Sequence, residues 1–264
     1  MTFLFDLLLC CYAAGLLLAV INLFSRRQYL DAAVNVLLGA ANAMQFGYIV
    51  WRWIEAGRPP FSNMFESLFL FAWATAFIYL VLRLRLRIPF LSAAVALMVT
   101  VILVYASSYE SHIEPLVPAL RSNWLTFHVL TCFLGYSGFA ISFIAAVAYL
   151  VVIRRPGPSA EQSGFMLENA MSRTAAFGFI FLTIGIISGS VWANSAWGTY
   201  WSWDPKETWS LITWFIYAAF LHCRYMRGWS GRRAAWISIV GFLSVLFTYI
   251  GVNFLLSGLH SYAK

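Results

Sequence analysis

The feature that most constrains the fold is a series of long apolar runs separated by short polar segments. A helix needs about 20 predominantly apolar residues to cross the hydrocarbon core of a bilayer. Eight runs approach or exceed that length, near 3–24, 30–53, 64–82, 88–106, 123–153, 172–192, 208–223 and 234–256. The pattern predicts an all-α polytopic membrane protein with about eight transmembrane helices, forming a single integral membrane domain over residues 1–264.

Composition agrees with this fold class and excludes others. Of the 264 residues, 62% are hydrophobic and only 10% are charged, whereas soluble domains have about 45–50% apolar and about 25% charged residues. An ordinary soluble enzyme, a disordered chain and a nucleic-acid-binding domain are all excluded. None of the four cysteines forms a C-x-x-C pair, so a thioredoxin-like redox site is not expected.

The distribution of cations predicts the orientation in the membrane. Twelve of the 17 Lys and Arg residues fall in the odd-numbered connections between the runs. By the positive-inside rule this side is cytoplasmic, so both termini face outward. No basic segment precedes the first run, so we expect 3–24 to be a retained span and not a cleaved signal peptide. The outward segments are then 54–63, 107–122, 193–207 and 257–264, and 154–164 is expected to be a flexible cytoplasmic linker.

Aromatic residues crowd one outward connection. The stretch 192–209 reads WANSAWGTYWSWDPKETW and contains Trp192, Trp197, Trp201, Trp203 and Trp209. One interpretation is an interfacial belt, because Trp favours the headgroup level. A belt would spread over all helix ends, so the crowding favours a platform for a large, flat, apolar ligand with polar edges.

Polar residues in the outward connections match helix starts. Asp204, Pro205 and Glu207 have the spacing of an N-cap, N1 and N3, and a proton-transfer role for the two acids is the alternative. Asn63 or Ser62 is expected to cap the third span, with Glu66 in a structural role just inside it. Cations available for an anionic ligand on this side are Arg58, Arg121 and Lys206.

Histidines are the candidate metal ligands. His128 lies about four residues into the fifth span and His260 just past the eighth. Each alone fits a hydrogen-bonded interfacial histidine, but together they can supply both axial positions of a haem iron. His222 lies 18 residues after Asp204, about 27 Å along a helix, so it is either a partner of the helix dipole or a ligand of a separate inner site. That inner site would need its second histidine from a partner, and His112 is interpreted as a solvated loop residue.

The segment 192–209 resembles the tryptophan-rich "WWD" signature of haem-handling proteins. These include the CcsA/ResC-type subunit of cytochrome c biogenesis system II and, more distantly, CcmC and CcmF of system I. Further similarity to the CcsA branch lies at 58–67, 113–129, 220–224 and 251–262, and the resemblance covers most of the chain from about residue 40.

The resemblance implies roles for particular residues. His128 and His260 match the two external histidines that ligate haem, and His222 matches a transmembrane histidine whose partner ligand lies in the companion CcsB subunit. The residues implied to contact the haem are Trp192, Trp197, Trp201, Trp203, Asp204 and Trp209.

The resemblance also implies an activity and partners. It implies a cytochrome c synthase component that conveys haem b across the membrane and positions it for attachment to the C-x-x-C-H cysteines of apocytochrome c. The implied partners are a CcsB/ResB-type membrane subunit, apocytochrome c and a thiol-reducing protein. The implied location is a bacterial-type inner membrane or its thylakoid equivalent, with the tryptophan-rich loop on the periplasmic face. Haem export without ligation, as in CcmC, is one alternative. A b-type electron-transfer cytochrome is another, which the single inner histidine disfavours.

Overall fold

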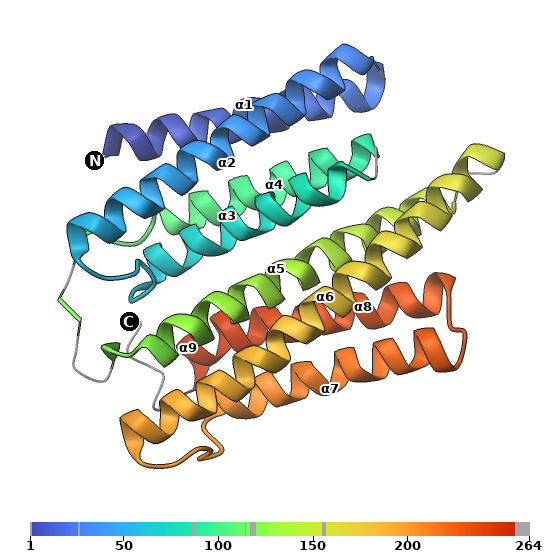
Figure 1. Ribbon diagram of the computed structural model, residues 1–264. Coiled ribbons are helices and arrows are strands. Elements are labelled where there is room, and N and C mark those ends of the chain that lie inside the picture. The colour runs from blue at the N-terminus through green and yellow to red at the C-terminus, as the bar shows by residue number, and fades with distance from the viewer. Residues whose placement is uncertain are drawn as a thin grey trace. The chain divides into compact units, whose positions relative to one another are not determined.

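The computed structural model describes residues 2–25, 27–85, 88–113, 115–116, 120–154 and 157–256 (Figure 1). Within these ranges it has no β-strand, so the all-α prediction is confirmed. The long helices are α1 (Thr2–Ser25), α2 (Gln28–Ala56), α3 (Met64–Arg83), α4 (Pro89–Ala106), α5 (Asn123–Val152), α6 (Pro158–Trp197), α7 (Pro205–Met226) and α8 (Gly231–Leu246). A π-helical turn, η2 (Phe247–Gly251), and the short helix α9 (Val252–Leu255) continue α8.

These helices confirm a polytopic membrane protein, with one helix for each expected span. In the described residues six of them are long and apolar enough to cross a membrane: α1, α2, α3, α5, α6, and α8 together with its continuation. Helix α4 is shorter, with an apolar part that covers Phe90–Ala106. Helix α7 has Lys206 and Glu207 in its first turn and Arg224 in its last, so its uninterrupted apolar stretch is shorter than those of the six.

Helix α6 differs most from the expectation. A span near 172–192 preceded by a flexible linker was expected, but the helix runs from Pro158 to Trp197. Its 40 residues correspond to about 60 Å, about twice the hydrocarbon thickness. Pro158 occupies the first turn, where its missing N–H costs nothing. The polar composition of 159–164 resembles a linker, but the helix there runs close to α5, since a Cβ atom at Gly164 would lie 3.5 Å from the Tyr149 ring.

The chain divides into two compact units, Met1–Pro115 and Leu116–Lys264. In the first, α1 packs against α2 and α4, and α3 also packs against α2 and α4. Side-chain amides bond across the apolar interior: the Tyr12 hydroxyl donates to Gln45 Oε1 at 2.8 Å, and Gln45 Nε2 donates to the Phe69 carbonyl at 2.9 Å. Such bonds hold transmembrane helices together where lipid provides no hydrophobic driving force.

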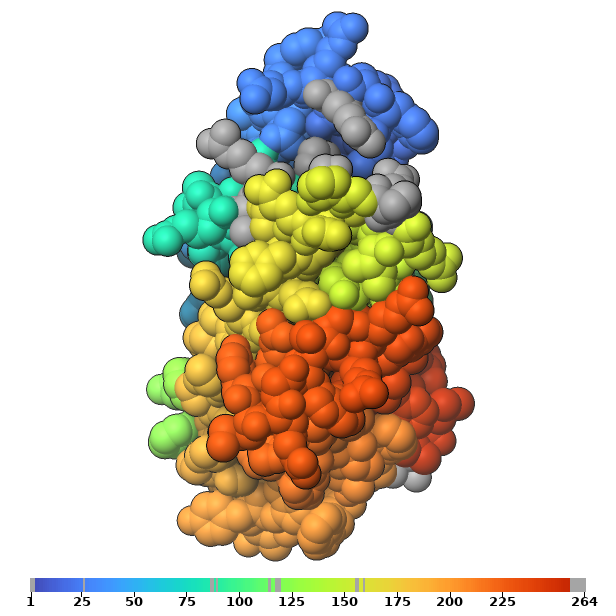
Figure 2. Space-filling view, turned by 90° about the vertical axis from the view of Figure 1, so that its right-hand side faces the viewer, coloured from blue at the N-terminus to red at the C-terminus, as the bar shows by residue number. Residues whose placement is uncertain are grey.

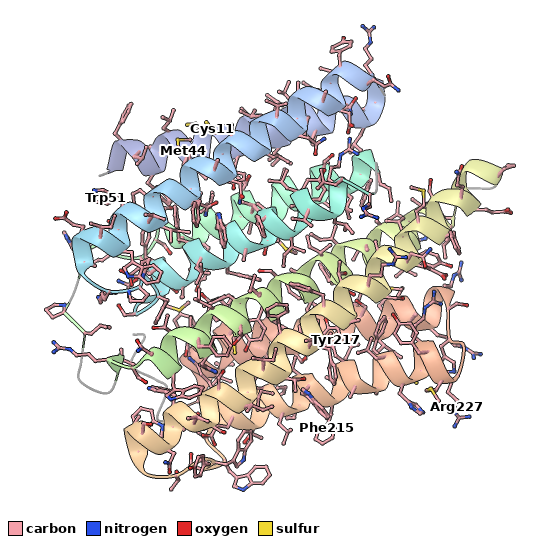
Figure 3. All side chains as sticks on the ribbon, viewed as in Figure 1. Cys11, Met44, Trp51, Phe215, Tyr217 and Arg227 are labelled. Atoms are coloured by element: carbon pink, nitrogen blue, oxygen red, sulfur yellow. The ribbon has the colours of Figure 1, made fainter. Side chains whose placement is uncertain are left out.

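In the second unit α5 and α6 pack along much of their length, while α8 packs against α5 and α7. The rings of Phe139 and Tyr217 stack with centroids 3.5 Å apart. Tyr217 points into the unit and Phe215 points away from it (Figure 3). The start of α5, the end of α6, the start of α7 and α9 lie at one end of this unit (Figure 1). Most of the candidate site residues are carried by these segments.

Candidate functional site

The best-defined candidate ligand is His128, in the second turn of α5. Ser122 caps this helix, and its hydroxyl accepts from the Trp124 N–H at 3.2 Å. The Nδ1 of the half-buried His128 lies 2.7 Å from the Gly185 carbonyl oxygen of α6. Because a carbonyl only accepts, Nδ1 carries the proton, and in the neutral ring Nε2 carries the lone pair. This is the tautomer that metal-ligating histidines adopt when a backbone carbonyl orients them.

A close approach of α6 fixes the position of this ring. A Cβ atom at Gly189 would lie 2.5 Å from His128 Nδ1, and one at Gly185 would lie 2.6 Å from Cys132 Sγ. No side chain fits at either position without displacing its neighbour. The Gly-x-x-x-Gly spacing of 185 and 189 is typical of helices that pack closely in membranes, and it was not singled out from the sequence.

Two of the tryptophans extend the His128 site as a row of rings. Trp192 is 1% exposed, and its ring lies nearly parallel to the His128 imidazole, with 6.3 Å between centroids and 16° between planes. Trp197 meets Trp192 edge-on at 5.2 Å. Both belong to α6 and not to a loop, because the helix continues to Trp197. Imidazole and indoles are therefore held by packed helices.

The connection from α6 to α7 is shorter than expected, and only residues 198–204 of the predicted 193–207 are non-helical. Gly198 ends α6 with φ 81, and Trp203 has the left-handed φ of 59 that is uncommon for a residue with a side chain. Trp203 is 68% exposed and its ring meets that of Trp201 at a right angle. The indole N–H of Trp201 is buried and has no hydrogen-bond partner among the described residues.

The start of α7 confirms the predicted capping box. The Asp204 carboxylate accepts from the Lys206 N–H at 2.9 Å, and the Glu207 carboxylate accepts from the Asp204 N–H at 3.2 Å, with Pro205 in the first turn. These acids thus fix the exit of the loop. Burial lowers the pKa of Lys206 to about 8, against the opposing effect of the Asp204 charge.

Trp209, in the second turn of α7, contacts the π-helical turn. Its ring centroid lies 4.1 Å from that of Phe247 in η2. The Thr248 hydroxyl of η2 approaches the Trp209 carbonyl at 3.2 Å and the Thr213 hydroxyl at 3.2 Å. π-Helical turns are rare, and those that occur are frequently found at functional sites. This one anchors the tryptophan-bearing helix to the segment that leads toward the C-terminus.

Of the two other candidate haem ligands, only His222 lies within the described residues. His222 is exposed on α7, near the far end of that 22-residue helix from Asp204. His260 lies outside the described residues. The last described helix, α9, ends at Leu255 at the same end of the unit as the start of α5 (Figure 1).

The predicted outer cations have different environments. Arg58 is 6% exposed, and its Nη1 lies 2.9 Å from a Glu66 carboxylate oxygen. Arg52, which sequence reasoning did not single out, also binds Glu66 at 2.9 Å, and it donates to the Ser111 and His112 carbonyls at 2.8 and 3.1 Å. Glu66 therefore has the expected structural role, and Asn63 caps α3 as predicted. Arg121 is exposed.

The family model described as "Cytochrome C assembly protein" matches residues 61–260. Curated relatives named "Cytochrome c biogenesis protein CcsA" include one from Guillardia theta, 42% identical, covering 80% of this chain and 79% of the relative. Another, from Synechococcus sp. (strain CC9902), is 40% identical and covers 87% of this chain and 86% of the relative.

A solved structure, "Cytochrome c Heme Lyase CcmF", has a similar fold, with a TM-score of 0.74 and 18% identity. The match covers 97% of this chain and 46% of that chain, so this chain spans about half the length of that protein. At this identity the likeness concerns the fold. The curated relatives are similar to this chain over most of both lengths, and the family model covers the region from α3 to the C-terminal segment. The chain therefore belongs to the CcsA-type family of cytochrome c biogenesis proteins.

Proposed function

We propose that this chain handles haem b during cytochrome c maturation and holds it at an outer site for attachment to apocytochrome c. The observation that carries the proposal is the His128 environment: an imidazole oriented by the Gly185 carbonyl at 2.7 Å and parallel to the buried Trp192 ring. Family membership supports the wider role in cytochrome c maturation. The donor set fits haem, because a neutral imidazole ligates the iron and indole rings pack against a porphyrin face.

Several residues would hold the haem in this scheme. His128 and His260 would ligate the iron, and Trp192, Trp197, Trp201, Trp203 and Trp209 would surround the macrocycle next to the Asp204 cap. The Trp201 N–H, which has no hydrogen-bond partner among the described residues, is suited to donate to a carboxylate oxygen. Lys206 and Arg121 are the more accessible cations for the propionates, whereas Arg58 is already bound to Glu66, and its propionate contact remains a prediction.

Thioether formation requires mainly that the haem and the thiols are held in the correct positions. Haem b supplies two vinyl groups, and each apocytochrome thiol adds across one of them, with sulfur bonding to one carbon and the hydrogen going to the other. No oxidant and no strong acid or base is consumed. The contribution of this chain is to hold the macrocycle in one orientation and exclude water, and positioning of this kind is worth several kcal/mol of the barrier.

The inner site requires a partner. His222 is exposed on α7, and an ionisable residue in a membrane helix is normally paired. We assign the second axial ligand of this inner site to a CcsB/ResB-type subunit. Haem then passes from the inner site to the outer site. We assign the protein to a bacterial-type inner membrane or the thylakoid equivalent, with the 198–204 loop on the outer face.

The test is maturation of a reporter apocytochrome when this chain and a CcsB-type partner are produced together. We expect covalent haem on the reporter, and a bis-histidine visible spectrum from the purified pair. Haem bound and released without thioether bonds would instead support the CcmC-like exporter. A purified pair without haem, together with an unmodified reporter, would contradict the proposal.

Lys206 provides a pH test of propionate binding. It lies two residues ahead of the expected seventh span, and its pKa of about 8 means that it loses its charge as pH rises through that value. A charged hydrogen bond to a carboxylate contributes about 1.5–3 kcal/mol, so haem affinity should fall at least about tenfold between pH 7 and 9.5. Haem titration followed by absorbance measures this. Lys206→Arg keeps its charge and should flatten the profile, whereas an unchanged slope in that variant would exclude Lys206 from the haem contact.

A further inference from the structure

A basic and aromatic turn joins α7 to α8 at the end of the unit opposite His128. This turn, residues 224–233, contains Arg224, Arg227, Arg232 and Arg233, and no acidic residue follows Glu207 anywhere in the sequence. The membrane-spanning helix Gly231–Leu255 begins within the turn. The turn therefore lies at a membrane surface, whichever side of the membrane that is.

The turn has a fixed conformation. Gly228 and Gly231 adopt positive φ values of 65 and 64, and the Trp229 N–H donates to the Cys223 carbonyl at 2.9 Å. The carboxylate of Glu168 on α6 accepts from the Gly231 N–H at 2.7 Å and pairs with Arg224 at 3.5 Å. Figure 2 shows the turn (orange) at the surface, with the start of α6 (yellow) nearby. Glu168 thus holds the turn against α6, and Arg224 neutralises its charge.

The remaining charge of the turn has no carboxylate partner among the described residues. Arg227, Arg232 and Arg233 are exposed, and in the described part of the chain no carboxylate lies within 4.0 Å of their guanidinium groups. The surface is complementary to an anion.

Exposed apolar side chains surround these cations and identify the kind of anion. Tyr225 is 61% exposed, Met226 74% and Trp236 59%. The Arg233 guanidinium lies 5.7 Å from the Trp229 ring centroid. Rings and a thioether next to arginines suit the boundary between headgroups and acyl chains, whereas a small soluble anion would leave these apolar side chains uncovered.

We propose that this turn binds the phosphate of an anionic phospholipid through Arg227, Arg232 and Arg233, with Tyr225, Met226 and Trp229 against its acyl chains. Each arginine near a membrane surface strengthens binding to an anionic headgroup by about fivefold. The three together should favour phosphatidylglycerol over phosphatidylcholine by about 100-fold.

The full chain, purified and stripped of lipid, can be titrated with each of these two lipids, of identical acyl chains, and the bound lipids counted by native mass spectrometry. We expect a first phosphatidylglycerol that binds about 100-fold more tightly than phosphatidylcholine. The variant R227Q/R232Q/R233Q should lose this preference, and R227K/R232K/R233K should keep most of it, because lysine retains the charge. If the triple Gln variant does not fold, R227Q alone should lose about fivefold.

The matched control is R27Q/R85Q/R154Q, which removes the same charge from other exposed positions and should leave the first lipid unchanged. Equal loss in this control would mean a general charge effect and would overturn the proposal. So would equal binding of the two lipids by the wild-type chain. Displacement of the lipid by excess inorganic phosphate alone would identify a simple anion site instead.

Discussion

Replacing His128 by alanine is expected to lower covalent haem attachment to a reporter apocytochrome by more than about 100-fold, because loss of an axial ligand exceeds the about 10–100-fold cost of second-shell changes. The measurement is haem-stained reporter produced together with a CcsB-type partner. Added imidazole should restore part of the haem content, since the truncation leaves space beside Trp192 where the ring had been. A merely structural defect would not respond to imidazole.

His112→Ala is the control for that variant. His112 is exposed, and its backbone carbonyl, which any residue supplies, accepts from Arg52 and Asn63. We expect the His112→Ala variant to mature the reporter apocytochrome as well as the wild type does. If His128→Ala matured the reporter as well as His112→Ala does, His128 would be removed from the haem site.

A second variant tests the position of His128 without deleting it. In Gly189→Ala the new Cβ would lie 2.5 Å from Nδ1, so the ring must move and lose its bond to Gly185. Haem affinity should fall by about 10–100-fold. Gly164→Ala in the same helix is the matched control, because its Cβ would meet the Tyr149 ring at an ordinary 3.5 Å. Wild-type affinity in Gly189→Ala would show that α6 does not position the ligand.

The features that local sequence determines were predictable. The capping box from Asp204 to Glu207 and the Asn63 cap depend on residues three positions apart, so spacing alone identifies them. The apolar runs of near-membrane length predicted where each long helix lies in the sequence. The length of α6 was not predictable in this way, because its first two turns are polar. Contacts with distant residues hold the N-terminal part of α6 in place: Gly164 lies near the Tyr149 ring, and Glu168 binds the α7–α8 turn.

The composition of the candidate site was predictable, but its geometry was not. The crowding of tryptophans indicated a ring-lined site, yet Trp192 and Trp197 are helical residues and only Trp201 and Trp203 lie in the connection. The bond from His128 to Gly185 joins residues 57 positions apart. Spacing along one helix cannot predict which face of another it meets. The role of Arg52 was missed for the same reason, since its partners are distant in the sequence.

Replacing Glu66 by alanine is expected to lower the free energy of unfolding by about 3–5 kcal/mol, as happens when one partner of a buried ion pair is removed. Its side chain is fully buried between Arg52 and Arg58, whose side chains are 2% and 6% exposed. Without the carboxylate, two guanidinium groups would remain buried with no negative charge beside them. Denaturant unfolding of the purified chain in detergent measures the change, and Glu55→Ala, at an exposed position of α2, should have no effect.

The same variant should also loosen a particular connection. Arg52 holds the Ser111 and His112 carbonyls while Glu66 holds Arg52, so losing the carboxylate frees the guanidinium to turn away. Hydrogen exchange should then increase at 107–113, while the backbone amide of Gln45, buried inside α2 in the middle of the same unit, should stay slow to exchange. Glu66→Gln preserves an acceptor oxygen without the charge, so its exchange rate at 107–113 should lie between those of the wild type and Glu66→Ala. Exchange that rises evenly through α1 to α4 would mean that Glu66 stabilises the whole unit and not this connection.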